Sequence, residues 1–252
     1  MRMKREPGLG KVPAVTLLFW IMKIIATTLG ETGGDTLSMS MGLGYLVSTA
    51  ILGTIFLAVV AVQIAAKRFN PWLYWTTIVA TTTVGTTLAD FADRSLGIGY
   101  AGGSALLLLL LATSLVIWHR TLGSVEISTI NSPRTEMFYW VTIMFSQTLG
   151  TALGDWTADS AGIGYAGGIL IFGVLLALVA AAYFWSSLSR TLLFWTAFVL
   201  TRPLGAVLGD FFDKPLASGG LALSRYTASA ILVVAIAVCI LVFQQRAARR
   251  VH

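Results

Sequence analysis

The sequence has 252 residues, of which 56% are hydrophobic and 11% are charged, with a formal net charge of +6. Soluble globular domains carry charge on about 25% of their residues, so this composition excludes an ordinary soluble protein and indicates an integral membrane protein. The lysines and arginines form no stripe along one soluble face, which argues against a nucleic-acid partner despite the positive charge.

Eight apolar segments follow one another along the chain, each close to the roughly 20 residues that a helix needs to cross a bilayer core. They predict an all-α, polytopic membrane protein in contact with the lipid bilayer. The expected helices span residues 13–30, 45–66, 72–90, 101–118, 137–155, 165–185, 191–210 and 226–243. The first segment follows a basic stretch, as in a secretory signal, but it carries the repeat described next and is therefore interpreted as a spanning helix.

The same motif begins in each odd-numbered segment. An aromatic residue and a tryptophan are followed by glycine ten residues after the tryptophan, and by aspartate five residues after that. The tryptophans are Trp20, Trp75, Trp140 and Trp195, and the aspartates are Asp35, Asp90, Asp155 and Asp210. We interpret the tryptophans as packing anchors. The periodicity predicts four repeats of two helices, and because each repeat contains two spans, all four run in parallel.

The spacing between repeats divides the chain into two halves. Successive repeat tryptophans are 55, 65 and 55 residues apart, so an insertion separates the second repeat from the third. We therefore expect a first membrane half at residues 1–120, a cytoplasmic linker at 121–136 and a second membrane half at 137–252.

The basic residues predict the orientation in the membrane. If the N-terminus is cytoplasmic, the outside segments hold Arg94, Lys214 and Arg225, and two further basic residues lie inside helices. The inside segments hold Arg2, Lys4, Arg5, Lys11, Lys67, Arg68, Arg120, Arg134, Arg190, Arg246, Arg249 and Arg250. This positive-inside bias predicts two cytoplasmic termini. The aspartates then converge at the outer ends of the odd helices, with the tryptophans toward the inner half.

Most acidic residues belong to the four motifs. Ionisable residues in spanning helices are costly and commonly mark ion pathways or proton relays. Carboxylate oxygens suit cations such as manganese, magnesium or calcium. The predicted metal ligands are Glu31, Asp35, Asp90, Asp155 and Asp210, and the predicted substrate pathway contains Lys23, Thr27, Asp93, Asp159, Arg202 and Asp213. The alternative is that these carboxylates are solvated helix-end residues or bind loose backbone at caps and turns.

Two basic residues stand inside apolar segments. Lys23 precedes Glu31 by eight residues, and Arg202 precedes Asp210 by eight, so each pair lies on nearly one helix face but two turns apart. Any direct partner is therefore expected from a neighbouring repeat. Either the two cations neutralise the acidic cluster and fix helix packing, or they compete with a transported cation or bind an anionic substrate.

Four tandem repeats, each with two spanning segments and a characteristic tryptophan, resemble a family of bacterial inner-membrane proteins known by that repeat and described as being of unknown function. The resemblance extends from about Phe19 to the last helix. It implies the repeat architecture and a multi-pass location in the bacterial inner membrane. It implies no mechanism, so function is predicted from the residues.

The leading functional hypothesis is a transporter or channel for a small cation, with a divalent metal exchanged against protons as its specific form. A carrier of a small organic or anionic solute anchored by Lys23 and Arg202 is the second hypothesis, and a membrane scaffold or sensor that moves no solute is the third. The sequence contains no Ser-His-Asp, Cys-His or paired-His arrangement, so we do not expect an enzyme. Assembly into a homo-oligomer is left open.

Overall fold

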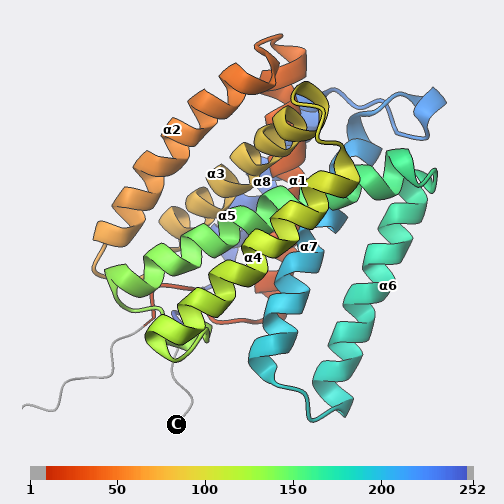
Figure 1. The fold of residues 1–252 in the computed structure, drawn as a ribbon. Coiled ribbons are helices and arrows are strands. Elements are labelled where there is room, and N and C mark those ends of the chain that lie inside the picture. Colours follow the sequence, from red (N-terminus) through yellow and green to blue (C-terminus); the bar gives the residue numbers. More distant parts are fainter. Residues whose placement is uncertain (1–9, 249–252) are drawn as a thin grey trace, which may run out of the picture.

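The computed structural model describes residues 10–248, apart from the side chain of Ser160, and contains eight α-helices in that range (Figure 1). They are α1 (Leu17–Asp35), α2 (Gly44–Ala65), α3 (Pro71–Asp90), α4 (Tyr100–Leu122), α5 (Pro133–Asp155), α6 (Gly164–Trp185), α7 (Arg190–Asp213) and α8 (Arg225–Val242). The predicted all-α fold of eight helices is confirmed. The predicted cytoplasmic positions of Arg2, Lys4, Arg5, Arg249 and Arg250 lie outside the described residues.

The first helix differs from its predicted range of 13–30, since α1 begins at Leu17 and ends at Asp35. The residues before it pair with the C-terminal segment instead: Ala248 donates a backbone hydrogen bond to Val12 (2.8 Å), and Ala14 donates one to Arg246 (2.8 Å). This pairing keeps the segment extended up to the helix cap. At the other end, the helix continues through the acidic motif.

Every odd helix begins at a polar capping side chain. Thr16, Asn70, Ser132 and Ser189 each accept a hydrogen bond from the backbone N–H three residues later. Such caps contribute about 1 kcal/mol each. The cap at Ser132, followed by Pro133 in the first helical position, starts α5 inside the predicted linker 121–136. The connection between α4 and α5 is therefore residues 123–132, including the short helix η3 (Ile127–Thr129).

The four odd helices form a closed ring. α1 packs against α3, α3 against α5, α5 against α7, and α7 back against α1. Each even helix lies outside the ring on the odd helix of the following repeat, so α2 covers α3, α4 covers α5, α6 covers α7 and α8 covers α1. Figure 1 shows α2 and α6 on opposite flanks of this bundle. The parallel repeats thus surround one axis in a pseudo-fourfold arrangement.

The outer helices present apolar side chains to their surroundings. Leu57, Leu109, Leu170 and Ile231, on the four even helices, are each at least 60% exposed. Five helices, α2, α4, α6, α7 and α8, are long and apolar enough to cross a membrane. The chain is therefore a multi-pass membrane protein. α1, α3 and α5 are more polar because they bury threonines and carboxylates inside the ring, and their crossing of the bilayer stays a prediction.

The repeat glycines bring neighbouring odd helices into close contact. Each repeat glycine packs against a residue of the next odd helix in the ring. On that helix, the contacted residue lies three positions before the helix's own repeat glycine. A Cβ atom added to Gly30 would lie 2.3 Å from Thr82, and one added to Gly205 would lie 2.1 Å from Thr27. Only glycine permits this helix approach, which explains why it recurs in every repeat.

We expect Gly205→Ala to lower the free energy of unfolding by about 1–3 kcal/mol, because the new methyl group must push α1 and α7 apart. Gly173→Ala, in the middle of α6, is the matched control, since a Cβ atom there meets no described residue within 4 Å beyond its chain neighbours and the nearby backbone of its own helix. Thermal unfolding of the purified proteins in detergent compares the two. Equal stability of both variants would contradict the proposed contact.

Aromatic side chains fill the end of the ring where the odd helices begin, which we call the aromatic end. Trp75, Trp140 and Trp195 are at most 5% exposed and pack with phenylalanines and tyrosines of all four odd helices. The hydroxyl groups of Tyr74 and Tyr139 lie 2.7 Å apart. The interpretation of the tryptophans as packing anchors therefore agrees with the structure for these three repeats.

Candidate functional site

Positions four residues apart on the odd helices form five successive layers of four equivalent residues. From the aromatic end, the layers are Phe19, Tyr74, Tyr139 and Phe194; Lys23, Ile78, Ile143 and Phe198; Thr27, Thr82, Gln147 and Arg202; Glu31, Thr86, Thr151 and Ala206; and Asp35, Asp90, Asp155 and Asp210. No residue in these layers is more than 8% exposed. The side chains change from aromatic to polar to acidic along the ring.

The last layer holds the four repeat aspartates in two pairs. Lys214 Nζ lies 2.9 Å from Asp210 Oδ1 and 3.2 Å from Asp35 Oδ2. Arg94 Nε lies 3.0 Å from Asp90 Oδ1, and its Nη2 atom lies 3.1 Å from Asp155 Oδ2. The repeats thus converge on one acidic layer, as predicted, but with two-plus-two pairing.

All three basic residues that were assigned to outside segments contact acidic side chains at this end. Arg225 pairs with Asp213, and its Nε atom lies 3.6 Å from Asp35 Oδ2. Burial lowers the pKa of Lys214, but the carboxylates of Asp210 and Asp35 outweigh it and raise the pKa above its usual value. Sequence reasoning missed these three residues as part of the site. The available signal was that Arg94 and Lys214 each follow a repeat aspartate by four residues, one helical turn.

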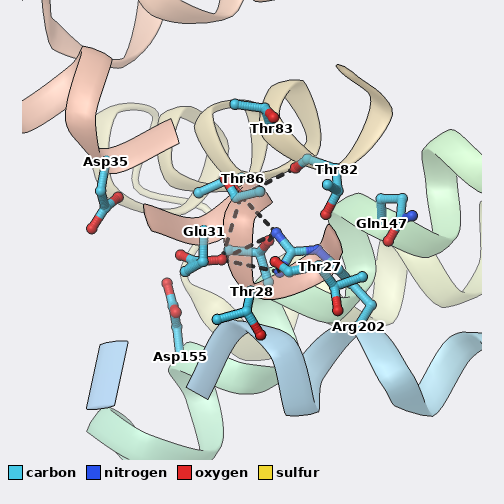
Figure 2. A network of polar contacts seen from close by, with 12 residues as sticks. Thr27, Thr28, Glu31, Asp35, Thr82, Thr83, Thr86, Gln147, Asp155 and Arg202 are labelled. Atoms are coloured by element: carbon cyan, nitrogen blue, oxygen red, sulfur yellow. Dashed lines mark hydrogen bonds and ion pairs between the residues drawn. The ribbon is translucent and has the colours of Figure 1, made fainter. Parts of the chain in front are cut away.

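The guanidinium group of Arg202 reaches the layer of Glu31, Thr86 and Thr151, one layer deeper than the aspartates (Figure 2). Its Nη1 and Nη2 atoms each lie 3.1 Å from Glu31 Oε2. Nη2 also donates to Thr86 Oγ1 at 2.6 Å and to Thr151 Oγ1. One guanidinium of α7 therefore joins side chains from the three other odd helices. The expectation that the buried cations find partners in another repeat holds for Arg202.

Three of the predicted metal ligands lie together. Glu31, Asp35 and Asp210 each offer one carboxylate oxygen, and these oxygens lie within 4.8 Å of one another. We call these residues the carboxylate cluster. Asp35 Oδ1 has no hydrogen-bond partner among the described residues, and neither does Asp155 Oδ1. Figure 2 shows the carboxyl group of Asp155 directed from α5 toward Glu31, although Asp155 is not one of the three residues of the cluster.

The other two predicted metal ligands, Asp90 and Asp155, lie in the same layer but are bound to Arg94. In the position of Glu31, the repeat that contributes Asp155 has Thr151. The two halves of the acidic layer are therefore chemically different, since one half adds a third carboxylate and the other adds a hydroxyl group.

Two predicted pathway residues lie deeper in the ring. Lys23 is fully buried, with Nζ 3.5 Å from Gln147 Oε1 and 4.2 Å from the ring centroid of Phe198. Thr27 donates to the backbone carbonyl groups of Lys23 and Thr201 and packs against Gly205. The contacts of Thr27 are those of a helix-packing residue.

The second carboxylates of the motifs are placed differently from one another. Asp93 is 7% exposed and packs against Gly103, and burial raises its pKa. Asp213 pairs with Arg225. Asp159 is exposed. Of these three residues, Asp213 is linked to the carboxylate cluster through a shared arginine, because Arg225 also approaches Asp35.

Three repeat aspartates stand where an α-helix passes into a π-helical turn. Asp35, Asp90 and Asp155 precede η1 (Thr36–Ser40), η2 (Phe91–Ser95) and η4 (Trp156–Ser160). The Gly-x-Gly sequences that follow have φ angles from 66° to 76°, which glycine adopts readily. In the fourth repeat, α7 instead continues to Asp213 and is followed by η5 (Leu216–Ser218). π turns are frequent at functional sites.

Four segments of the chain match the model of the Repeat of Unknown Function (DUF347) family: residues 18–69, 73–124, 138–189 and 193–249. The chain belongs to this family. Each DUF347 match covers one odd helix and the even helix that follows it, which confirms the four repeats and the resemblance. No curated protein and no solved structure matches the chain in the corresponding comparisons. The function of this DUF347 protein is therefore argued from its site.

Proposed function

We propose that this protein is a membrane carrier for a small cation, which binds at the carboxylate cluster of Glu31, Asp35 and Asp210. The observation that carries the proposal is the position of these three side chains, whose oxygens lie within 4.8 Å of one another inside a ring of helices. Buried carboxylates in a membrane protein are costly and by default functional. Oxygen ligands at this spacing suit a hard divalent cation such as manganese, magnesium or calcium.

Proton exchange fits the same cluster. Carboxylates must be deprotonated to bind a metal ion, so metal binding to a protonated site releases protons. The cluster holds more than one carboxylate within the reach of a single ion. A divalent cation entering from one side would therefore be exchanged against protons, and internal pH reports that exchange.

The aromatic end supports a carrier over an open channel. Tyr74 and Tyr139 are fully buried there, with their hydroxyl groups bonded to each other, and Phe19 and Phe194 complete the layer. These side chains fill the axis below the polar layers. A cation bound at the acidic end can therefore leave at the aromatic end only after the helices rearrange.

The carrier of an organic or anionic solute receives less support. Arg202 already binds Glu31 and two threonines. Lys23 lies two layers away from Glu31. An anion carrier predicts that Lys23→Gln and Arg202→Gln reduce transport more than any aspartate change does. A scaffold predicts that changes in the motif reduce stability while no solute is moved at all.

Flux into proteoliposomes tests the proposal. We expect the wild-type protein to take up at least one of manganese, magnesium or calcium, with a change of internal pH that depends on the proton gradient. Asp210→Asn should reduce that uptake at least about tenfold, the effect of losing about 1.4 kcal/mol of binding free energy. Its thermal unfolding should stay close to that of the wild type.

Two results would overturn the proposal. One is the absence of flux for all three cations from protein that unfolds cooperatively in detergent. The other is unchanged flux in both Asp210→Asn and Asp90→Asn, since these substitutions alter both halves of the acidic layer. Either result would favour an organic solute as the ligand, which a ligand screen by thermal shift would test.

A further inference from the structure

We propose that Lys214 is a displaceable internal cation, whose ammonium group occupies the carboxylate cluster and leaves it when the transported cation binds. The inference rests on the proposed function and assigns a specificity-determining residue to it. Lys214 Nζ bridges Asp210 Oδ1 at 2.9 Å and Asp35 Oδ2 at 3.2 Å. These two aspartates are also two of the three cluster residues.

The position of Lys214 in the chain allows it to leave. It is the first residue after α7, with extended backbone angles (φ −72°, ψ 154°). Its side chain is 15% exposed, whereas those of Asp35 and Asp210 are at most 4% exposed. The ammonium therefore reaches buried carboxylates from the edge of the site. A lysine side chain is a flexible stem with a compact charge, so it can swing to solvent without moving the helix.

The cluster has more oxygen atoms than one ammonium uses. Lys214 contacts one oxygen of each aspartate, and Asp35 Oδ1 has no hydrogen-bond partner within residues 10–248 although Asp35 is 1% exposed. Asp155, which is 2% exposed, also has an oxygen, Oδ1, without a partner in the described part of the chain, and its carboxyl group is directed toward Glu31 in Figure 2. Divalent cations take six or more oxygen ligands. Within the cluster itself, Asp35 Oδ1 is an oxygen that is available to a metal ion and that Lys214 does not use.

Arg94, at the equivalent position of the second repeat, supplies an internal comparison. It clamps Asp90 and Asp155 through two different nitrogen atoms, and its Nη1 atom lies 3.4 Å from the hydroxyl group of Tyr45. A guanidinium has a planar fork of donors that matches carboxylates and always stays charged. Arg94 is therefore suited to a permanent clamp, and Lys214 to reversible occupancy.

Displacement also gives Lys214 a function in the carrier that has no cation bound. With the ammonium in place, its single positive charge offsets part of the negative charge of two buried carboxylates in the unloaded site, which lowers the cost of keeping them buried. An incoming cation must compete with the ammonium, so Lys214 sets the affinity.

Binding of Mn²⁺ to the purified full-length protein tests the inference. Free Mn²⁺ is measured by electron paramagnetic resonance during titration of the wild type, Lys214→Met, Lys214→Gln and Arg94→Met. We expect both Lys214 variants to bind Mn²⁺ at least about tenfold more tightly than the wild type, a gain of about 1.4 kcal/mol. Arg94→Met changes the net charge of the acidic layer by the same amount. It therefore measures the general electrostatic effect, and we expect a clearly smaller gain.

A second readout follows the ammonium group itself. Acylation of Lys214 by an amine-reactive reagent, quantified by mass spectrometry, should become several-fold faster when Mn²⁺ is added to the wild type. The same experiment on Asp210→Asn should show no Mn²⁺ effect, because the site is then incomplete. Lys67, on the connection between α2 and α3, serves as the labelling reference within the same chain.

The outcomes separate this inference from the proposed function. If the wild type binds Mn²⁺ in a manner that Asp210→Asn abolishes, but the Lys214 variants bind no more tightly than Arg94→Met, displacement is wrong and the cation site stands. If Mn²⁺ leaves the acylation rate of Lys214 unchanged in such a protein, displacement is also wrong. If no variant binds Mn²⁺, magnesium or calcium, the proposed function fails and the inference fails with it.

Discussion

Arg202→Met should lower the free energy of unfolding by about 3–5 kcal/mol, the largest stability effect that we expect from any single substitution in this chain. Arg202 is fully buried, and the side chain of its partner Glu31 is 4% exposed. The variant leaves this carboxylate without its cation and leaves Thr86 and Thr151 without a donor. Chemical unfolding in detergent, followed by tryptophan fluorescence, measures the loss.

The double variant Arg202→Met, Glu31→Gln is the control for this prediction. It removes both charges, so the penalty of an uncompensated buried carboxylate disappears and the double variant should be more stable than Arg202→Met alone. The two changes are in contact, and their effects should therefore not add. A single-variant loss below about 1 kcal/mol, or strict additivity, would show that the pair contributes little to the fold.

Asp35→Asn should reduce cation uptake at least about tenfold while leaving the fold intact, the second large effect that we expect. Asp35 belongs to the carboxylate cluster and carries the unpartnered oxygen Oδ1. An amide keeps the shape of the side chain but removes the charge that a cation needs. Initial uptake rates in proteoliposomes measure the effect.

Asp159→Asn is the matched control, since it is the same chemical change at an exposed aspartate in η4. We expect its uptake to stay within about twofold of the wild type, because surface substitutions away from buried networks have small effects. Equal uptake by Asp35→Asn and Asp159→Asn would remove Asp35 from the cation site. Equal, large losses would extend the pathway to the exposed motif residue.

The departures from repeat symmetry concentrate at the contact between α1 and α7. The first repeat contributes Lys23 and Glu31, and the fourth contributes Arg202 and Lys214. At most of the corresponding positions, the second and third repeats have isoleucine, threonine or glutamine. The ring closes where α7 meets α1. The first and last repeats therefore differ from the others on the faces that they turn toward each other, and the proposed cation site lies at that closure.

Local features of the sequence were enough to predict the eight helices and their grouping. Apolar length specifies a spanning helix without knowledge of its neighbours, and the recurrence of tryptophan, glycine and aspartate at fixed spacing identified the four repeats. The helix ends were less accurate. The start of α1 depends on pairing between residues 10–14 and 246–248, and no local pattern reports a contact with the opposite end of the chain.

The repeat spacing was enough to predict that eight acidic residues accompany the repeat motifs and that the repeat aspartates meet at one end, because parallel repeats place equivalent residues together. Which of these residues share a site depends on how the helices pack. Closure of the ring places α7 beside α1, and this contact unites Glu31 and Asp35 with Asp210 and turns Arg202 toward Glu31. It likewise brings Lys214 to Asp35. Spacing along the chain carries no information about these pairs, because their members are far apart in sequence and meet only through the order of helices around the axis.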